Sequence, residues 1–151
     1  MRVDFYQLGA ELPERTIPLL AAKALQAGER LLVVSALEDQ LRAIGDALWA
    51  DSPQDFLANG MAGGPHDARQ PILLSPNCQP ANGARLVMFA DGEWRDEALG
   101  GTGETPFTRA FLLFGDAALQ GARACWRMLG ERDDVERRFW KLENGRWREG
   151  P

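Results

Sequence analysis

The sequence predicts an α/β fold: a mostly parallel sheet covered by helices on both faces, with an antiparallel hairpin at its C-terminal edge. Short apolar runs alternate along the chain with segments of helical periodicity, which is typical of parallel sheets. Some runs, such as residues 30–36, are almost continuously apolar, as in strands that are covered on both faces. Near the C-terminus, Asn144 and Gly145 separate two strand-like runs, which indicates a hairpin.

The N-terminal third predicts a strand, a helix, a second strand and a second helix. Residues 3–8 form the first strand. Pro13 suits the start of the helix that follows, and Gly28 suits its end. The second strand is the run at residues 30–36, and the second helix spans residues 37–50. Apolar residues recur at helical spacing in this second helix, namely Leu41, Ile44, Ala47 and Leu48.

The rest of the chain begins with a long, turn-rich connection at residues 51–70. We expect three further apolar strands, at residues 71–75, 85–90 and 108–115. The clearest helix of the chain then follows, with Asp116 as its N-terminal cap and Gly130 at its end. Because 151 residues are enough for one core of ordinary size, we expect a single domain over residues 1–151.

The distribution of charge indicates the kind of partner. The net charge of −5 argues against general binding to nucleic acid, because nucleic-acid-binding proteins usually carry a basic surplus. Residues 121–151, however, hold 8 of the 17 Lys and Arg residues and only 6 of the 22 Asp and Glu residues. The acidic body of the protein therefore has a locally basic C-terminal end, which suits an acidic partner.

We expect a cytoplasmic protein without a metal or cofactor. The sequence contains no run of about 18 apolar residues that would span a membrane, and its start lacks the pattern of a secretory leader. Cys78 and Cys125 form no C-x-x-C pair, which favours a reducing compartment. Together with His66, the only histidine, they give too weak a pattern for a zinc site.

The glycine-rich stretch GGTGETPFT, residues 100–108, is similar to a phosphate-binding loop. Such a loop follows a strand, opens a helix and contains a lysine that reaches the terminal phosphates. Here the stretch precedes a strand and contains Glu104, whose charge would repel phosphate. We therefore interpret it as a linker, and residues 94–97 (WRDE) as an exposed loop. No dinucleotide fingerprint follows the first strand either, so we expect a Rossmann-like topology without a nucleotide site.

Most of the chain resembles one family, the chi subunit of bacterial DNA polymerase III. Its most specific segments are ALWADSPQDFLANG at residues 47–60 and QPILLS at residues 70–75. The other segments that carry the resemblance are VDFYQL at residues 3–8, GPHDARQPILLS at 64–75, ARACWRML at 122–129 and RRFWKLENGRW at 137–147. Residues 92–106 form a less typical insert, whose role the sequence leaves open.

The resemblance implies an accessory subunit of a DNA-directed DNA polymerase, with no catalytic activity of its own and no cofactor. Chi-type subunits are adaptors: they link the clamp loader, usually through a small partner called psi, to the single-stranded-DNA-binding protein. Contact with nucleic acid would then be indirect. Two alternatives stay open, namely a small α/β enzyme that acts on a nucleotide or phosphate ester, and an adaptor to a DNA-repair helicase.

The predicted helix at residues 116–129 supplies the main candidate site. The residues on its apolar side, which should face the sheet, are Ala118, Leu119, Ala122, Cys125 and Leu129. Arg123 and Arg127 lie one turn apart at the border of that side, with Trp126 between them and the core. Two guanidinium groups beside an aromatic wall suit a chain-end carboxylate with an apolar last residue. The resemblance implies the same ligand, because chi-type proteins bind the acidic, phenylalanine-ended tail of the single-stranded-DNA-binding protein with this helix.

A second candidate surface lies near the end of the second helix. Trp49 and Phe56 flank a segment in which Pro53 breaks the helical pattern. Either aromatic could belong to the core, but the resemblance implies contacts there with the clamp loader, with psi or with a helicase.

The tail-binding patch on the predicted helix at residues 116–129 would be extended by three further cations, Arg137, Arg138 and Lys141.

Overall fold

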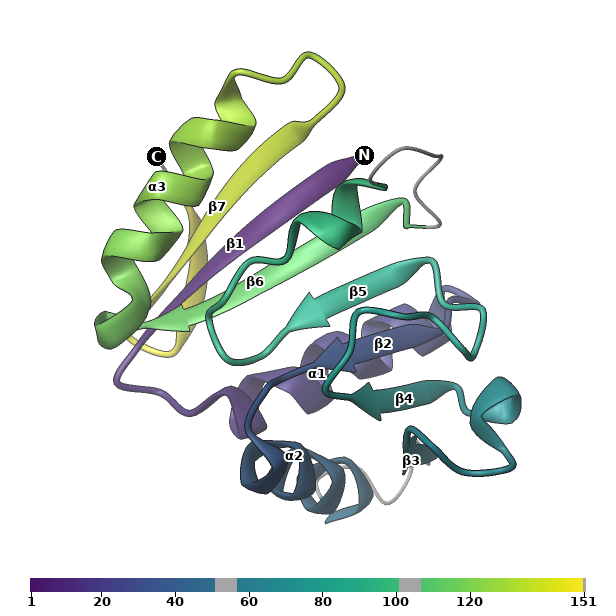
Figure 1. Ribbon diagram of the computed structural model, residues 1–151. Coiled ribbons are helices and arrows are strands. Elements are labelled where there is room, and N and C mark those ends of the chain that lie inside the picture. The colour runs from purple at the N-terminus through teal and green to yellow at the C-terminus, as the bar shows by residue number, and fades with distance from the viewer. Residues whose placement is uncertain (51–56, 101–106, 151) are drawn as a thin grey trace.

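The computed structural model describes residues 1–50, 57–100 and 107–150. Within these ranges, eight strands form one sheet in the order β3-β4-β2-β5-β6-β1-β7-β8 (Figure 1). The strands are β1 (Arg2–Gly9), β2 (Leu31–Val34), β3 (Asn59–Met61), β4 (Ile72–Ser75), β5 (Leu86–Phe89), β6 (Arg109–Gly115), β7 (Glu136–Glu143) and β8 (Arg146–Glu149). Neighbouring strands are parallel except β7 and β8, which are antiparallel. The predicted sheet is therefore confirmed.

Helices cover both faces of the sheet, as the sequence predicts (Figure 1). α1 (Pro13–Gln26) and α2 (Glu38–Ala50) lie on one face, called the α1 face below. α3 (Leu119–Gly130) lies on the opposite face, called the α3 face. The described residues also form three short 3-10 helices, η1 (Asp67–Arg69), η2 (Asp96–Leu99) and η3 (Asp116–Ala118).

The alternation of side chains in β1 shows how one strand supplies both cores. Val3 and Phe5 pack beneath α3, whereas Tyr6 and Leu8 pack beneath α1 and α2. This follows from strand geometry, because successive side chains point to opposite faces. All four residues of β2 are fully buried, which is why this central strand reads as a continuous apolar run.

Two elements differ from the prediction. Strand β3 lies within the connection that the sequence predicts as turns, and it pairs with β4 so that Asn59 lies opposite Ile72. It is short, at the sheet edge and partly exposed, so no apolar run marks it. The cap assigned to Asp116 is also wrong. Asp116 begins the 3-10 helix η3, α3 begins only at Leu119, and neither helix has a side-chain capping bond.

Residues 92–100 cover part of the α3 face, so the prediction that residues 94–97 form an exposed loop is wrong for half of them. The Trp94 ring packs edge-on against Phe89, with 5.3 Å between the ring centroids. Arg95 forms a short ion pair of 2.7 Å with Asp91, and of residues 94–97 only Asp96 and Glu97 are exposed. The first part of the less typical insert therefore helps to close the core, while residues 101–106 lie outside the described residues.

The C-terminal hairpin is as predicted. Asn144 and Gly145 connect β7 to β8 with φ angles of 51° and 75°. Both angles lie in the left-handed region that a tight two-residue hairpin turn requires and that Asn-Gly adopts readily. The turn brings Trp147 of β8 opposite Leu142 of β7. None of the described helices is long and apolar enough to cross a membrane.

Candidate partner-binding site

The helix residues that the sequence singles out line one pocket on the α3 face. Arg123, Trp126 and Arg127 of α3 form its walls together with Phe139 of β7, and its volume is about 250 Å³. Both arginines are exposed and lie one helical turn apart. Neither forms an ion pair with another described residue. The pocket, called the α3 pocket below, therefore combines an aromatic floor with two available guanidinium groups.

Trp126 is held in a fixed orientation at the base of the α3 pocket. Its ring meets Phe5 and Phe139 edge-on, at centroid distances of 5.2 and 5.7 Å. The guanidinium of Arg137 stacks on the indole at 4.1 Å from the ring centroid and donates a 2.6 Å hydrogen bond to the Trp126 carbonyl oxygen. Half-buried and packed on several sides, the indole presents a preformed apolar surface to the pocket.

The opposite side of α3 anchors the helix to the sheet. Ala122, Cys125 and Leu129 are buried there, as the helical spacing predicts. Burial raises the pKa of Cys125 to about 12, so the thiol remains protonated at neutral pH and serves as a small packing group. With this side fixed against the sheet, the position of the arginines at the border follows from the geometry of the helix.

Phe139 is the pocket residue that sequence reasoning missed. The signal that could have found it is the alternation along β7, since Phe139 points to the α3 face with Arg137 and Lys141. The same alternation sends Arg138 to the α1 face, where it pairs with Glu136 and Glu149. The expectation that Arg138 extends the α3 patch is therefore wrong.

Trp49 lies at the end of α2, with 51% of its surface exposed, so it is not a core residue. Phe56, the other aromatic of this candidate surface, lies outside the described residues. Trp49 belongs to a helix on the α1 face, whereas the α3 pocket is on the opposite face (Figure 1). Trp49 and the α3 pocket are thus on different sides of the sheet.

In related folds, a phosphate binds at the N-terminus of a helix. In this chain, the N-termini of the helices carry acidic residues. Glu14 lies in the first turn of α1, Glu38 and Asp39 lie in that of α2, and Asp116 precedes α3. A helix N-terminus favours anions, but a carboxylate at that place either occupies the anion position itself or repels a phosphate from it. The glycine-rich stretch also runs into strand β6 and not into a helix, as the sequence predicts. This arrangement disfavours a nucleotide site at the usual edge of the sheet.

The three residues considered for a metal do not act together. His66 is exposed in the turn before η1, Cys78 is half-buried and Cys125 lies under α3. Burial raises the pKa of Cys78 to about 11, which disfavours the thiolate that a metal needs. Among the described residues, no cluster of three His, Cys, Asp or Glu side chains could hold a metal ion.

Comparison with known families identifies the family to which the chain belongs. A family model described as DNA polymerase III chi subunit, HolC, matches residues 1–135. The chain belongs to this family. Membership of this family makes it an accessory subunit of DNA polymerase III. The resemblance noted in its sequence is therefore confirmed. No curated protein matches the chain.

The extent of the chi match divides the α3 pocket. All of α3, with Arg123, Trp126 and Arg127, lies within residues 1–135. Strands β7 and β8 begin at Glu136 and Arg146 and lie beyond these residues, so the closing segment RRFWKLENGRW is outside the match. The helix of the α3 pocket therefore lies within the matched residues, whereas the wall formed by Phe139 lies outside them.

Proposed function

We propose that this chi-family chain is a non-catalytic adaptor in DNA replication. It would link the clamp loader of DNA polymerase III to the acidic C-terminal tail of the single-stranded-DNA-binding protein. The observation that carries the proposal is the α3 pocket, in which two exposed arginines border an apolar hollow lined by Trp126 and Phe139. An acidic chain end with a terminal aromatic residue has the complementary chemistry.

In this mechanism, the terminal carboxylate of the tail binds the guanidinium groups of Arg123 and Arg127. A guanidinium can donate two parallel hydrogen bonds to one carboxylate, which gives direction as well as attraction. The terminal aromatic side chain enters the hollow of about 250 Å³ and packs against Trp126 and Phe139. Acidic residues farther along the tail are attracted to the locally basic end of the chain.

Such a contact would involve only a short stretch of the tail, and the tail would dissociate and rebind readily. Both arginines are exposed, so their attraction to the tail weakens as salt screens it, with a Debye length of about 8 Å at physiological ionic strength. The apolar part of the contact is small, since a single side chain fills the hollow. Moderate affinity suits such an adaptor. It must hold the polymerase near a template strand that is covered by the single-stranded-DNA-binding protein, and it must let go when that protein is displaced.

The second partner would bind on the other side, near Trp49. Trp49 is half exposed on the helix α2, and exposed tryptophans often carry much of the energy of an interface. Because α2 and α3 lie on opposite faces, tail and clamp loader could be bound at the same time (Figure 1). A psi-type subunit or a DNA-repair helicase would use the same surface.

The tail contact can be tested by fluorescence titration with a peptide of the tail. Replacing Arg127 with Ala should weaken binding about tenfold or more, because a charge-assisted hydrogen bond contributes roughly 1.5–3 kcal/mol, and replacing both Arg123 and Arg127 should weaken it further. The melting temperature should barely change, since both side chains are exposed. A peptide that lacks its terminal Phe should also bind more weakly.

The matched control replaces Arg15 and Arg42 with Ala. These two arginines are also exposed on helices, but they pair with Glu11 and Glu38 on the opposite face. The control should keep wild-type affinity for the tail. Equal affinity of the wild type and the Arg123/Arg127 variant, or indifference to the missing Phe, would contradict the proposal.

The surface around Trp49 can be tested independently. The amount of clamp loader captured from cell extract is compared between the wild type and Trp49→Ala.

A further inference from the structure

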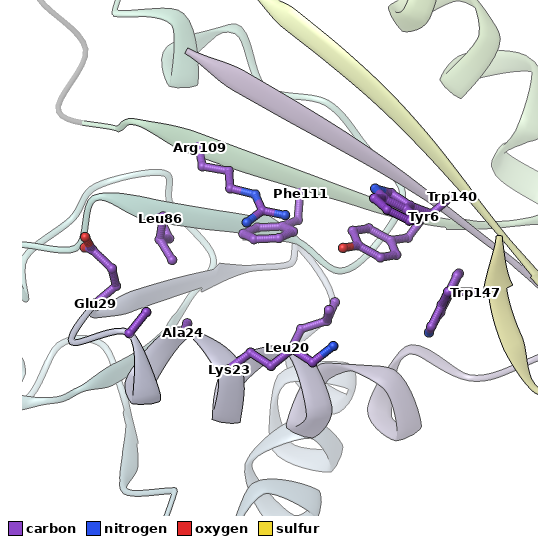
Figure 2. Close-up of a pocket in the computed structure, with 11 residues that line it drawn as sticks. Tyr6, Leu20, Lys23, Ala24, Glu29, Leu86, Arg109, Phe111, Trp140 and Trp147 are labelled. Atoms are coloured by element: carbon purple, nitrogen blue, oxygen red, sulfur yellow. The ribbon is translucent and has the colours of Figure 1, made fainter. Parts of the chain in front are cut away.

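A second and larger pocket lies on the opposite face, between α1 and the C-terminal hairpin. Its volume is about 390 Å³, within the range of small-ligand sites. Figure 2 shows Tyr6, Arg109, Phe111 and Trp140 on the sheet side and Lys23 on the helix side, with Trp147 at one end. We call it the hairpin pocket. It is remote from the α3 pocket, because the sheet separates the two.

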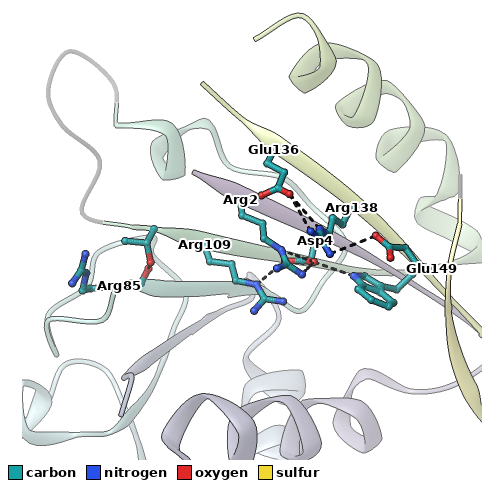
Figure 3. Close-up of polar contacts among 9 residues, drawn as sticks. Arg2, Asp4, Arg85, Arg109, Glu136, Arg138 and Glu149 are labelled. Carbon is teal, nitrogen blue, oxygen red and sulfur yellow. Dashed lines mark hydrogen bonds and ion pairs between the residues drawn. The ribbon is translucent and has the colours of Figure 1, made fainter. Parts of the chain in front are cut away.

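One wall of the hairpin pocket is built around a fully buried carboxylate. Asp4 accepts hydrogen bonds from Arg109 Nε at 2.6 Å, from Arg2 Nη2 at 2.9 Å and from Trp140 Nε1 at 3.0 Å (Figure 3). Two guanidinium groups around one carboxylate leave this cluster with a net positive charge. The cluster also fixes Arg109 and Trp140 in place before any ligand arrives, so their orientation costs little on binding.

Arg109 is held as a donor at the wall of this pocket. Its contact with Asp4 uses Nε, so the bond leaves the four N–H groups on the terminal nitrogens for other acceptors. Its guanidinium carbon lies 4.4 Å from the centroid of the Phe111 ring, a stacking contact that keeps the group flat against the sheet. Since 31% of its side chain is exposed, solvent and ligands can reach it.

The other walls are largely aromatic. Tyr6 stacks on Trp140 with 6.3 Å between ring centroids and meets Trp147 edge-on at 5.0 Å. Figure 2 shows the Tyr6 hydroxyl pointing into the pocket, toward Phe111 and Arg109. Burial, together with the neighbouring Asp4 carboxylate, raises the pKa of Tyr6 above its usual value, so the hydroxyl keeps its proton at neutral pH. Leu20 of α1 and Leu86 of β5 add apolar surface.

The charges around the pocket favour an anion near Arg109 and Lys23. Lys23 is exposed on α1 and forms no ion pair with another described residue. The carboxylate that lines the pocket, Glu29, lies at the end remote from Trp147 (Figure 2). An acidic group between Arg109, Lys23 and the Tyr6 hydroxyl would thus meet two cations and a neutral donor. A ring attached to it would pack toward Trp147.

We propose that the hairpin pocket binds a small planar aromatic molecule that carries one acidic group, either a carboxylate or a phosphate. The ring packs against Trp147 and the leucine side chains, and the acidic group binds Arg109 and Lys23. The two tryptophans that close the pocket come from β7 and β8, which lie beyond the residues that match the chi family. The hairpin pocket and the α3 pocket lie on opposite faces of the sheet, so this site is separate from the adaptor function proposed above.

The test uses NMR of the full chain labelled with ¹⁵N, in which each of the five tryptophans gives an indole N–H signal. Trp→Phe variants assign the signals. The probes are indole-3-acetate for a carboxylate and thymidine 5′-monophosphate for a phosphate, and the uncharged controls are indole-3-acetamide and thymidine. At least one acidic probe should shift the signals of Trp140 and Trp147, with a dissociation constant of about 1 mM or lower. Which acid binds more tightly distinguishes the two sources of the charge.

Charge reversal at Lys23 provides the second arm. Lys23→Glu should weaken the acidic probe about fivefold or more, since an attractive partner becomes a repulsive one. The matched control is Lys141→Glu, the only other lysine, which lies on the α3 face and should leave the affinity unchanged. Four results would each overturn the proposal: no shift with either acid, equal binding of the uncharged controls, shifts confined to Trp126, or equal loss in both lysine variants.

Discussion

Phe139 and Trp140 are neighbours in β7, yet they line two different pockets on opposite faces of one sheet. On the α3 face, the cations are exposed arginines on a helix, and they extend into solvent. On the α1 face, Arg109 is fixed against a buried carboxylate and an aromatic ring. Exposed cations that can adapt suit the end of a partner chain, whereas a fixed cation in a larger pocket suits a small ligand.

The comparison also shows how differently the two faces depend on polar groups. The α1 face contains the fully buried carboxylate of Asp4 in β1, whereas the polar anchor of the α3 face, Asp91, lies in the loop after β5. The burial of Asp4 is compensated by hydrogen bonds from three residues, Arg2, Arg109 and Trp140. Loss of Asp4 should therefore destabilise the protein more than loss of Asp91.

Removal of Asp4 should have the largest effect on stability. Asp4→Ala leaves Arg2 and Arg109 together without their shared carboxylate, and breaking a buried ion pair in this way costs about 3–5 kcal/mol. The indole N–H of Trp140 also loses its acceptor, so the hairpin should loosen. Urea denaturation followed by fluorescence measures the loss.

The matched control for Asp4 is Asp134→Ala. Asp134 also forms a short ion pair, at 2.9 Å with Arg132, but its side chain is 67% exposed. Exposed pairs contribute little, so this variant should have the same urea midpoint as the wild type. A similar small change for both variants would mean that the Asp4 cluster does not hold the α1 face together.

Asp91 should give the α3 face a dependence on pH. Burial by itself would raise the pKa of Asp91, but Arg95 and the backbone N–H groups of Ala36 and Glu93 outweigh it and lower the pKa below its usual value. A lowered pKa in the folded state stabilises the protein above the unfolded value of about 3.9. That contribution is lost as the pH falls through the folded value.

The variant Asp91→Asn tests this expectation. At pH 7 it should unfold with about 2 kcal/mol less free energy than the wild type, because Arg95 loses the charge that pairs with it. The difference should shrink as the pH is lowered below about 4, where the wild-type carboxylate itself takes up a proton. Urea denaturation at several pH values measures it. A constant difference from pH 7 to the acid limit would rule out the lowered pKa.

The parts of the fold that could be predicted are those with a strong local signal. The buried strands read as apolar runs, the α3 helix reads from the spacing of Ala122, Cys125 and Leu129, and Asn144-Gly145 marks the hairpin. Strand β3 could not be predicted. It consists of three partly exposed residues at the sheet edge, and its place depends on pairing with β4 and not on its own composition.

The same contrast applies to the sites. Arg123, Trp126 and Arg127 lie within one helix, so their spacing alone brings them together, and their binding role remains a prediction. The hairpin pocket takes Tyr6, Lys23, Arg109 and Trp147 from separate elements. No local pattern joins such residues, because only the crossover that places β6, β1 and β7 side by side assembles them.

The smallest expected effect on stability concerns Arg137 and Arg138. These consecutive residues of β7 point to opposite faces of the sheet. Arg137→Ala removes the stacking on Trp126 and the hydrogen bond to its carbonyl oxygen, which together should contribute about 1 kcal/mol. Arg138→Ala removes only exposed pairs with Glu136 and Glu149, so its free energy of unfolding should change by less than about 0.5 kcal/mol.

Tail binding should separate these two variants further. In Arg137→Ala the indole of Trp126 loses the group that holds it, so affinity for the tail peptide should fall about threefold. In Arg138→Ala the α3 pocket is untouched, and affinity should be that of the wild type. Peptide titration and urea denaturation on both variants give the two measurements. Equal losses of affinity would mean that general positive charge near the C-terminus, and not the face to which a cation points, attracts the tail.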